Sequence, residues 1–596
     1  MKDNLQKNAT DRRMKSRVTT VFYLTFWVFV ILSLRLFQVQ VVQAGRFEKL
    51  ADMEHDEKVS IPAVRGSIYD SRGELLAIST TGYSVAAEPD KISDKEGTAE
   101  SLAPVLKMAP RDIESLLDSP GGFAWISRKI SPDEVEKVRE MNLSGIEVVE
   151  EPTGKRIYPR GKLACHVLGY TGVDEQGLDG IELYYDKELR GSPGYYQASI
   201  DGLGRVMPDG ISKLTPAVSG ADITLTLDES LQYLAERELE NCVKSRHAKS
   251  GSIIIMDPNT GAILALASYP NFDGNHYADY PESALRDRAI SDDYEPGSTF
   301  KSVLAAAALD SGKVTMDEKF LSSPAIEVGG WGIRNAEDGL MPVAPMCDIK
   351  EIMKDSLNVG AASIGLKIGG PTLWDMIQRM GFTKTTGIDL PGEAQALIPD
   401  PKSWAPVQLA TISFGQGIAV TPIQMATAYS IIANGGYPVR PHLVRKIVFP
   451  DGTVTQESST RGDRPVLRPE TVQDLKYMLS LVVKSGTGTT AAIPSYTVAG
   501  KTGTAQVDRN GQYLSGQYIA SFIGFAPAEN PAFVMLVKID QPRWPYWGGT
   551  VSAPIFKEIG SELLWRYQIP PSEGMTRVGP FDVWGEEQGN KIRKLN

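Results

Sequence analysis

Glu295-Pro296-Gly297-Ser298-Thr299-Phe300-Lys301 precedes an alanine-rich run at residues 302–309. Pro-Gly breaks the preceding chain, and the alanine-rich run predicts a helix that starts beside Ser298. At a helix N-terminus the Ser298 hydroxyl is exposed, and the positive end of the helix dipole lies near any developing negative charge. Lys301 follows on the same helix face and can take the Ser298 proton if its amine is neutral. The stretch therefore predicts a serine nucleophile with a lysine base.

Two further short motifs follow in chain order. A Ser-x-x-Lys spacing alone is weak evidence, because it recurs by chance about once or twice in a chain of this length. The additional motifs are Ser356-Leu357-Asn358 and Lys501-Thr502-Gly503-Thr504, which begin 58 residues (356 − 298) and 203 residues (501 − 298) after Ser298. A serine nucleophile with Ser-x-Asn and Lys-Thr-Gly is the set found in β-lactamases and penicillin-binding proteins. The three motifs together predict one acyl-transfer site.

The second motif supplies a hydroxyl and an amide. Ser356 can relay a proton between the Ser298/Lys301 pair and the departing or attacking amine. The Asn358 side-chain amide can hold a peptide carbonyl. We therefore expect Ser298, Lys301, Ser356, Asn358 and Lys501 to be the catalytic residues.

The third motif suits the binding of an extended peptide that ends in a carboxylate. Lys501 adds a second cation, and the hydroxyls of Thr502 and Thr504 can donate to the same carboxylate. Gly503 lets backbone come close, so an exposed strand edge there can bind a peptide. The Thr504 N–H would join the Ser298 N–H as the oxyanion hole.

The N-terminal region predicts a membrane anchor. Residues 18–34 carry no charge, and apolar residues continue past Arg35 to residue 42, which gives enough length to span a bilayer. Basic residues before this run predict a cytoplasmic N-terminus and an extracytoplasmic remainder. A cleaved signal peptide, with a small-residue site at 42–44, is the alternative, but the apolar stretch is longer than a usual signal sequence.

Changes in composition divide the rest of the chain. Residues 47–58 suit a short polar stalk. Residues 61–219 then suit an irregular α+β domain with strands at 83–87 and 145–149. The expected parts are a cytoplasmic tail at 1–17, a transmembrane anchor at 18–42, a stalk and pedestal domain at 43–220, a catalytic domain at 221–569 and a loose polar tail at 570–596.

The expected catalytic domain has the elements of one antiparallel sheet flanked by helices. Alternating residues at 222–228 predict a half-buried strand, and 230–243 an amphipathic helix. Apolar runs predict two pairs of antiparallel strands. These are 252–256 with 262–267, and 521–525 with 532–539, followed by a helix at 553–567. We expect one sheet to collect these pieces, which makes the chain a multidomain α+β or α/β protein.

Charge and metal-binding residues exclude other functions. A net charge of −11 argues against a nucleic-acid surface, which needs clustered Lys and Arg. The three cysteines, Cys165, Cys242 and Cys347, lack the spacing of a zinc site or a disulfide framework, and the five histidines are scattered. We therefore expect no metal site, and the family resemblance given next implies that no cofactor is required.

The chain resembles the class B penicillin-binding proteins over most of its length. Beyond the three catalytic motifs, the resembling segments are 65–73, 156–159, 166–172 and 180–182 in the first domain, and 415–417, 421–424 and 499–506 in the second. The resemblance implies an irregular pedestal domain followed by a β-lactamase-like transpeptidase domain.

The resemblance also implies the activity, which is that of a peptidoglycan D,D-transpeptidase. Ser298 would attack the D-Ala-D-Ala end of one stem peptide, D-alanine would leave, and an amine of a neighbouring stem would resolve the acyl-enzyme. β-Lactams would acylate Ser298 by mimicking that dipeptide. The pedestal segments are most similar to the division-type member, which works in the cell inner membrane at the septum with a polytopic glycosyltransferase of the SEDS family and other division proteins.

Three alternatives share part of this pattern. An elongation-type transpeptidase would carry the same catalytic residues. A β-lactamase or D,D-carboxypeptidase would use water in place of the amine, although Leu357 stands where β-lactamases have Asp. A β-lactam sensor or a scaffold would be expected to lack a complete catalytic set.

Overall fold

The computed structural model of the protein describes residues 2–46, 56–119, 122–200, 206–335, 345–456, 460–509, 512–572 and 574. Its contacts divide the chain into two units. The first comprises residues 1–63 and 192–218, and the second comprises 64–191 and 219–596. The predicted C-terminal tail lies mostly outside the described residues.

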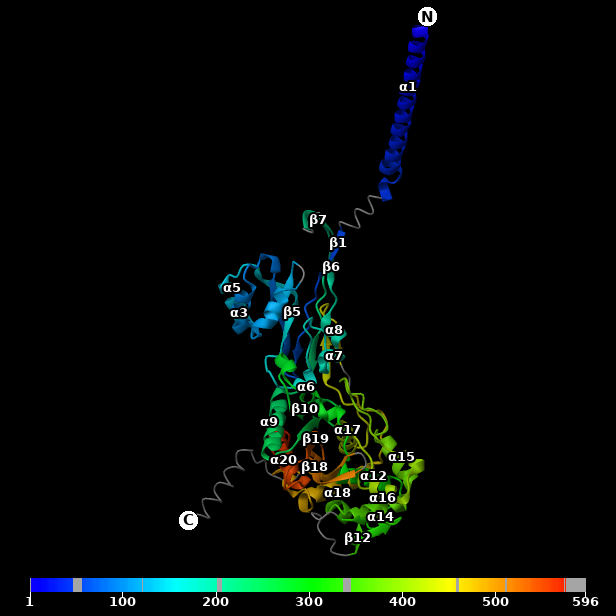
Figure 1. Ribbon diagram of the computed structural model, residues 1–596. Coiled ribbons are helices and arrows are strands. Elements are labelled where there is room, and N and C mark those ends of the chain that lie inside the picture. The colour runs from blue at the N-terminus through cyan, green and yellow to red at the C-terminus, as the bar shows by residue number, and fades with distance from the viewer. Residues whose placement is uncertain are drawn as a thin grey trace. The chain divides into compact units, whose positions relative to one another are not determined.

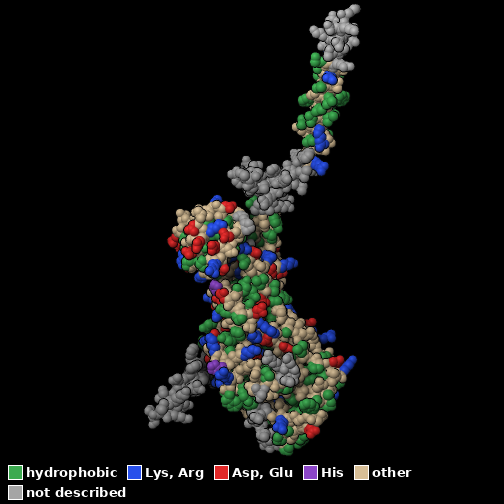
Figure 2. Space-filling view, in the orientation of Figure 1, with side chains coloured by type: hydrophobic (Ala, Val, Ile, Leu, Met, Phe, Trp, Pro, Cys, Tyr) green, Lys and Arg blue, Asp and Glu red, His purple; other side chains and the backbone are tan. Residues whose placement is uncertain are grey.

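The first unit begins with a long apolar helix. Helix α1 spans Lys2–Phe37 and continues into a short π-helix, η1, at Gln38–Val42. Within Met14–Val42 an 18-residue stretch has a mean hydropathy of 1.9 and none of its residues is buried within the protein, so by length and composition the helix can cross a membrane. Figure 2 shows hydrophobic side chains along the described part of this helix. The predicted anchor at 18–42 lies within it.

A three-stranded antiparallel sheet completes the first unit. Its order is β1 (Asp56–Ile61), β6 (Gly194–Ile200) and β7 (Val206–Thr215). Most of the predicted stalk, residues 47–55, lies outside the described residues. Residues 56–58 of the predicted stalk belong to β1.

The second unit contains a seven-stranded sheet. In order its strands are β16 (Val454–Gln456), β15 (Val444–Val448), β8 (Asp222–Leu225), β2 (Ile68–Tyr69), β3 (Leu75–Ala87) and β4 (Ala124–Ile130), with β5 (Ile146–Ile157) also paired to β3. The strands predicted at 83–87 and 145–149 are confirmed within β3 and β5. A separate apolar core joins them to helices α3 (Lys95–Leu106), α4 (Pro110–Leu117) and α5 (Pro132–Met141).

Strand β8 corrects the predicted sheet. Its burial alternates as expected, but it pairs parallel to β2 and antiparallel to β15 and does not join the strands that carry the catalytic motifs. The short helices α6 (Cys165–Leu168), α7 (Gly180–Tyr184) and α8 (Asp186–Arg190) lie in the chain between β5 and β8. The predicted boundary at residue 220 therefore falls inside a shared sheet.

The other predicted strands form the five-stranded antiparallel sheet of the second unit (Figure 1). In order they are β10 (Ile263–Tyr269), β9 (Ser250–Met256), β19 (Phe533–Asp540), β18 (Gln512–Ala526) and β17 (Ala499–Arg509). Both predicted strand pairs are confirmed. Strand β17, which carries the Lys-Thr-Gly motif, is an edge strand.

Both faces of this sheet are buried, which explains its nearly continuous apolar strands. Ile253 and Ile255 of β9 lie in the core formed with helices α9 (Glu229–Ser245) and α20 (Ala553–Arg566). Ile254 alternates to the other face, in the core that contains helices α12 (Lys301–Asp310) and α17 (Pro422–Ala433). The predicted helices at 230–243 and 553–567 are confirmed as α9 and α20.

The second unit contains further helices, some of which pack against α12. They are α10 (Glu282–Leu285), α11 (Arg288–Ser291), α13 (Ile349–Lys354), α14 (Asn358–Ile368), α15 (Gly370–Arg379), α16 (Pro406–Ile412), α18 (Pro469–Ser485) and α19 (Gly548–Val551). Two small antiparallel pairs complete this region: β11 (Lys319–Leu321) with β14 (Met346–Asp348), and β12 (Ala325–Val328) with β13 (Trp331–Arg334).

The ordered part of the second unit continues past its predicted end at residue 569. Ser572 is only 7% exposed. Its backbone N–H donates to the Ser495 carbonyl at 3.0 Å, and its hydroxyl accepts from the Thr497 N–H at 2.9 Å. The expectation of a loose tail from residue 570 is therefore wrong for residues 570–572.

Candidate functional site

Ser298 lies in a 3₁₀ turn, η4 (Gly297–Phe300), that leads directly into α12. Gly297 has φ of +53°, a left-handed conformation that glycine adopts without strain. Its N–H donates to the Gly415 carbonyl at 3.0 Å. On the other side, the Tyr429 hydroxyl donates to the Thr299 carbonyl at 2.9 Å. The turn is thus held from both sides, and Ser298 stays partly exposed.

Lys301 starts α12 and is fully buried. Its Nζ donates to the Ser356 carbonyl at 2.7 Å, to Ser356 Oγ at 3.3 Å and to Asn358 Oδ1 at 2.8 Å. Ser356 follows Lys301 by 55 residues (356 − 301), so the first two motifs meet at the Lys301 amine.

Ser356 connects the two lysines of the site. Lys501 is also fully buried, and its Nζ donates to Ser356 Oγ at 2.9 Å. Ser356 has φ of +59°, a conformation that is uncommon for a residue with a side chain and that clusters at functional sites. The three motifs are thereby joined in a hydrogen-bonded series, Lys301–Ser356–Lys501.

The side-chain amide of Asn358 already has partners within the site. Its Oδ1 accepts from Lys301, and its Nδ2 donates to the Arg334 carbonyl at 3.2 Å. One amide hydrogen remains for a substrate carbonyl, because Nδ2 carries two. Asn358 therefore acts first as a partner of Lys301, and second as a group that can hold a substrate.

Gly503 brings strand β17 against the turn that carries Ser298. A Cβ at position 503 would lie 2.3 Å from Ser521 Oγ, 3.0 Å from Thr299 Cγ2 and 3.2 Å from the Pro296 carbonyl oxygen. These distances leave no room for a side chain, so glycine is required for this approach. The close packing sets the edge strand beside the nucleophile turn.

The threonines of the third motif have partners that the sequence analysis did not identify. The hydroxyls of Thr502 and Thr487 lie 2.7 Å apart, and Thr504 Oγ1 accepts from the Gly548 N–H at 3.1 Å. Thr487 follows α18 in a Gly- and Thr-rich stretch, 485–489, which is the only sequence signal it offers. The Thr504 hydroxyl keeps its hydrogen for a substrate.

The carboxyl group of Asp355 directly precedes Ser356 in the sequence. Burial raises the pKa of Asp355, and the nearby Lys354 and, less strongly, Lys501 oppose this shift. Lys301 and Lys501 both place an amine beside Ser356, and a second cation at Lys501 would suit a substrate that ends in a carboxylate.

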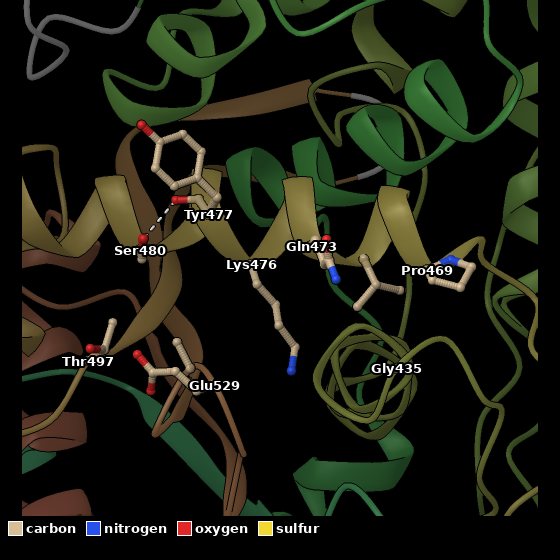
Figure 3. A pocket seen from close by; sticks show the side chains of 10 residues that line it. Gly435, Pro469, Gln473, Lys476, Tyr477, Ser480, Thr497 and Glu529 are labelled. Atoms are coloured by element: carbon tan, nitrogen blue, oxygen red, sulfur yellow. Dashed lines mark hydrogen bonds between the residues drawn. The ribbon is translucent and has the colours of Figure 1, made fainter. Parts of the chain in front are cut away.

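A separate cavity of about 470 Å³ lies against α18. Figure 3 shows Lys476 extending from α18 into this space, with Thr497 and Glu529 to one side. Burial lowers the pKa of Lys476 to about 8. The predicted catalytic residues do not line this cavity, so it is distinct from the site assembled around Ser298.

Two family models match the chain. Residues 251–561 match the penicillin binding protein transpeptidase domain, and residues 60–225 match the penicillin-binding protein dimerisation domain. The first of these contains the three motifs and the five-stranded sheet.

Curated relatives match nearly the full length. The chain is 34% identical to "Stage V sporulation protein D" of Bacillus subtilis, over 94% of this chain and 87% of the relative. It is 33% identical to "Peptidoglycan D,D-transpeptidase FtsI" of Escherichia coli, over 90% and 89%, respectively. It is 32% identical to "Probable peptidoglycan D,D-transpeptidase PenA" of Neisseria meningitidis, over 94% of each.

Solved structures share the fold. A peptidoglycan synthetase from Bifidobacterium adolescentis superposes with a TM-score of 0.70 at 27% identity, covering 88% of this chain and 98% of that one. Penicillin binding protein 3 from Mycobacterium tuberculosis, complexed with aztreonam, superposes with a TM-score of 0.67 at 27% identity, covering 87% and 99%.

Proposed function

The chain belongs to the class B penicillin-binding proteins and is a peptidoglycan D,D-transpeptidase, and from this premise we propose that Ser298 is its nucleophile. The observation that carries the proposal is the Lys301–Ser356–Lys501 series, which gathers three distant motifs beside the turn that bears Ser298. Ser298 is partly exposed at the start of this turn and α12, where an attacking oxygen is accessible.

Proton transfer would run through the buried amines. Lys301, in its neutral form, takes the Ser298 proton as Oγ attacks the carbonyl carbon of the substrate. Ser356, which is hydrogen-bonded to both lysines, passes a proton to the leaving amine. Asn358 keeps the Lys301 amine directed to this series through its Oδ1.

The edge strand would bind the donor peptide. Lys501 attracts the terminal carboxylate, and the Thr502 and Thr504 hydroxyls are close enough in sequence to share it. The backbone N–H groups of Ser298 and Thr504 would stabilise the developing oxyanion. Gly503 supports this role because its lack of a side chain lets β17 approach the Ser298 turn.

The reaction then has two balanced steps. The Ser298 Oγ–carbonyl bond forms as the peptide C–N bond breaks, and the leaving D-alanine nitrogen gains a proton. In the second step an amine of another stem peptide attacks the ester carbon, loses a proton and forms the new peptide bond, while Ser298 Oγ regains its hydrogen. Hydrolysis, the alternative, would use water in this second step.

The test is acylation of the detergent-solubilised full chain by a fluorescent penicillin, followed by mass spectrometric mapping of the labelled peptide. We expect stable labelling at Ser298, no labelling of Ser298→Ala, and unchanged labelling of Ser403→Ala, a variant at an exposed serine. Rapid turnover without a trapped adduct would instead indicate a β-lactamase. A folded protein that does not react would refute the proposed nucleophile.

The division of the chain is also part of the proposal. We assign residues 18–42 to a single-pass anchor, 43–220 to the stalk and pedestal, and 221–569 to the transpeptidase domain. Lys and Arg before the apolar segment favour a cytoplasmic N-terminus and an extracytoplasmic catalytic domain. Cysteine accessibility on either side of the anchor, measured in intact cells, tests this orientation.

The cellular role is proposed to be septal. Similarity to the E. coli protein named FtsI supports a division enzyme that acts with a polytopic SEDS-family glycosyltransferase, whereas similarity to the B. subtilis sporulation protein supports a sporulation role. A fluorescent fusion that gathers at the division site, and that cross-links to a SEDS protein there, supports the first role. Labelling confined to developing spores supports the second, and labelling along the side wall supports elongation.

A further inference from the structure

Lys538 is a buried lysine that the proposed mechanism does not use. It lies on β19, the central strand of the five-stranded sheet, and is only 2% exposed. Lysine is rarely buried to this extent unless its charge is paired. Its Nζ donates to Asp540 Oδ1 at 2.5 Å, and the Ser250 hydroxyl donates to Asp540 Oδ2 at 2.8 Å. The ammonium group is therefore held in place by an ion pair, and the carboxylate of this pair is itself held by a hydrogen bond.

The register of the sheet places Lys538 in line with the Lys-Thr-Gly motif. Directly paired residues of neighbouring strands share one face of a sheet. One row of such residues crosses all five strands, and its members are small or polar: Gly503, Ser521, Lys538, Ser252 and Ser268. The next row on the same face begins at Lys501 and is otherwise apolar: Ile523, Leu536, Ile254 and Leu266. Lys538 therefore belongs to a polar row that begins beside the nucleophile turn.

The segment that leads to Ser298 lies over this polar row. At its start, the centroid of the Tyr294 ring lies 5.2 Å from Lys538 Nζ. At its end, Pro296 and Thr299 approach Gly503 so closely that no side chain fits there. Strands β19 and β17 lie two strand spacings apart, which is about 10 Å. The segment 294–299 is thus set against the sheet at two points, and Ser298 lies between them in sequence.

The contact between Tyr294 and Lys538 is a cation–π pair that is shielded from solvent. Tyr294 is 4% exposed and belongs to the apolar core that contains α12 and α17. Cation–π pairs are stronger where both groups are desolvated. Two backbone hydrogen bonds to Val420, at 3.0 and 2.9 Å, hold Tyr294 in position above the sheet. The ring carries the contact, because the buried Tyr294 hydroxyl has no hydrogen-bond partner among the residues that the structure describes.

Stability alone does not explain a buried ion pair at this position. Replacing both members of such a pair by uncharged residues of similar size is often neutral or stabilising, whereas removing one member leaves an unpaired charge and is destabilising. The pair of Lys538 and Asp540 does, however, fix a cation against Tyr294, four residues before Ser298. An uncharged pair could not make this contact.

We propose that Lys538 is a positioning residue for the nucleophile: its ammonium group, oriented by Asp540, fixes the Tyr294 ring and thereby the turn that presents Ser298. Lys538 acts through Tyr294 and not on the substrate. The inference rests on the proposed function, because Ser298 is the group that is positioned.

Two variants of the ion pair test this role on the solubilised full chain. Acylation rates come from fluorescent penicillin labelling, and stabilities from thermal unfolding. Asp540→Asn should lower the melting temperature, because Lys538 loses its counter-charge, but should keep the acylation rate within about twofold, because the cation–π pair remains. Lys538→Met combined with Asp540→Asn should return the melting temperature toward that of the wild type and slow acylation about tenfold. The two variants are therefore expected to rank in opposite order for stability and for rate.

Substitutions of Tyr294 test the same contact with the ion pair intact. Tyr294→Phe keeps the ring and should keep the acylation rate. Tyr294→Leu should slow acylation about as much as the loss of Lys538, and combining it with the double variant should add no further loss, because all these changes remove one contact.

A matched control and a pH profile complete the experiment. Lys367 is paired with Glu318 and lies 5.6 Å from the centroid of the Phe320 ring, so Lys367→Met combined with Glu318→Gln removes the same kind of contacts elsewhere. This control should acylate at the wild-type rate. Loss of positioning should slow acylation by the same factor at every pH, whereas a direct electrostatic effect of Lys538 on the Lys301 amine would shift the pH profile.

The outcomes separate this role from the function on which it rests. Failure of penicillin to label the folded wild-type protein at Ser298 would refute the proposed nucleophile. Three results with normal labelling would overturn the role of Lys538 alone: a wild-type rate in the double variant, rates that fall in step with melting temperature across the variants, or a shifted pH profile.

Discussion

At the scale of single residues, Ser356 combines a costly backbone conformation with the central position of the site. Its hydroxyl accepts from both Lys301 and Lys501, while its φ of +59° is of a kind that costs on the order of 1 kcal/mol or more. A glycine would satisfy the backbone at lower cost. The retained side chain is therefore explained by its hydroxyl.

Two substitutions separate the contribution of the Ser356 hydroxyl to the reaction from the cost of its backbone conformation. We expect Ser356→Ala and Ser356→Gly to slow acylation of Ser298 by about 10²-fold or more, because both remove the proton relay. Ser356→Gly should be the more thermally stable of the two, since it relieves the left-handed strain. Rates come from fluorescent penicillin labelling and stabilities from thermal unfolding. Equal labelling by wild type and both variants would remove Ser356 from the mechanism.

Glu236 gives a stability that depends on pH. Burial raises its pKa to about 7 from 4.5, although its Oε1 accepts from the Ala164 N–H and Gln232 Nε2, both at 2.7 Å. A carboxyl with a raised folded-state pKa contributes stability that is complete below pH 4.5 and is lost as pH rises through 7.

We therefore expect Glu236→Gln to remove this pH dependence. Glutamine stays neutral and its oxygen can still accept both hydrogen bonds. Relative to wild type, the variant should gain up to about 3 kcal/mol between pH 4.5 and 7. Denaturant unfolding at several pH values measures the difference, and a gain that is the same at pH 4.5 and at pH 8 would contradict it.

At the scale of elements, helix α18 contacts the parts of the fold that carry the motifs. It packs against α12, α13 and β17. Just after its end, the Thr487 N–H donates to the Lys354 carbonyl at 3.3 Å, and the Thr487 hydroxyl lies 2.7 Å from that of Thr502. The end of α18 thus fixes the second and third motifs relative to each other.

This contact leads to a prediction for Thr487→Val, which keeps the shape of the side chain and removes its hydroxyl. We expect acylation of Ser298 to slow about fivefold, because the net value of a hydrogen bond is about 1 kcal/mol. The melting temperature should change little. Thr489→Val, at the start of the next short helical turn, serves as the control. A normal rate for Thr487→Val would show that Thr502 needs no support from it.

Elements of this region were predictable where the pattern is local. Apolar runs and a turn sequence predict β9 and β10, and three motifs predict the residues that meet around Ser356. The partner of β8 was not predictable, because Ile68 and Tyr69 form only two residues of strand and pair with it over a separation of about 155 residues. The sequence analysis did not identify Thr487 as a site residue for a similar reason, since only tertiary packing brings its hydroxyl to that of Thr502.

At the scale of the second unit, three segments singled out in the first domain converge on one buried ion network. Arg65 donates from Nε to Glu182 Oε2 at 2.7 Å, and Arg156 donates from Nε to Glu182 Oε1 at 2.6 Å. Arg65 also pairs with Asp186 at 2.7 Å, and Arg156 donates to the Gly66 carbonyl. These three segments therefore stabilise the fold through buried ion pairs and do not take part in the chemistry of the active site.

Removing the shared carboxylate should destabilise the whole unit. We expect Glu182→Ala to lower the free energy of unfolding by about 3–5 kcal/mol, because two buried arginines lose their counter-charge. Asp186→Ala should cost less, since its side chain is 25% exposed. Thermal unfolding of both variants, monitored as the loss of penicillin binding with rising temperature, measures the two destabilisations. Equal losses for the two would contradict the central place of Glu182.

The pairing of β9 with β19 has a consequence for the biosynthesis of this protein. Ile253 faces Val537, 284 residues later (537 − 253), and the strand that carries Lys501 joins the same sheet. A nascent chain that is still emerging from the ribosome therefore lacks a complete five-stranded sheet until about residue 540 has been synthesised. The growing polypeptide therefore remains unreactive toward substrate and antibiotic alike until its synthesis is almost complete.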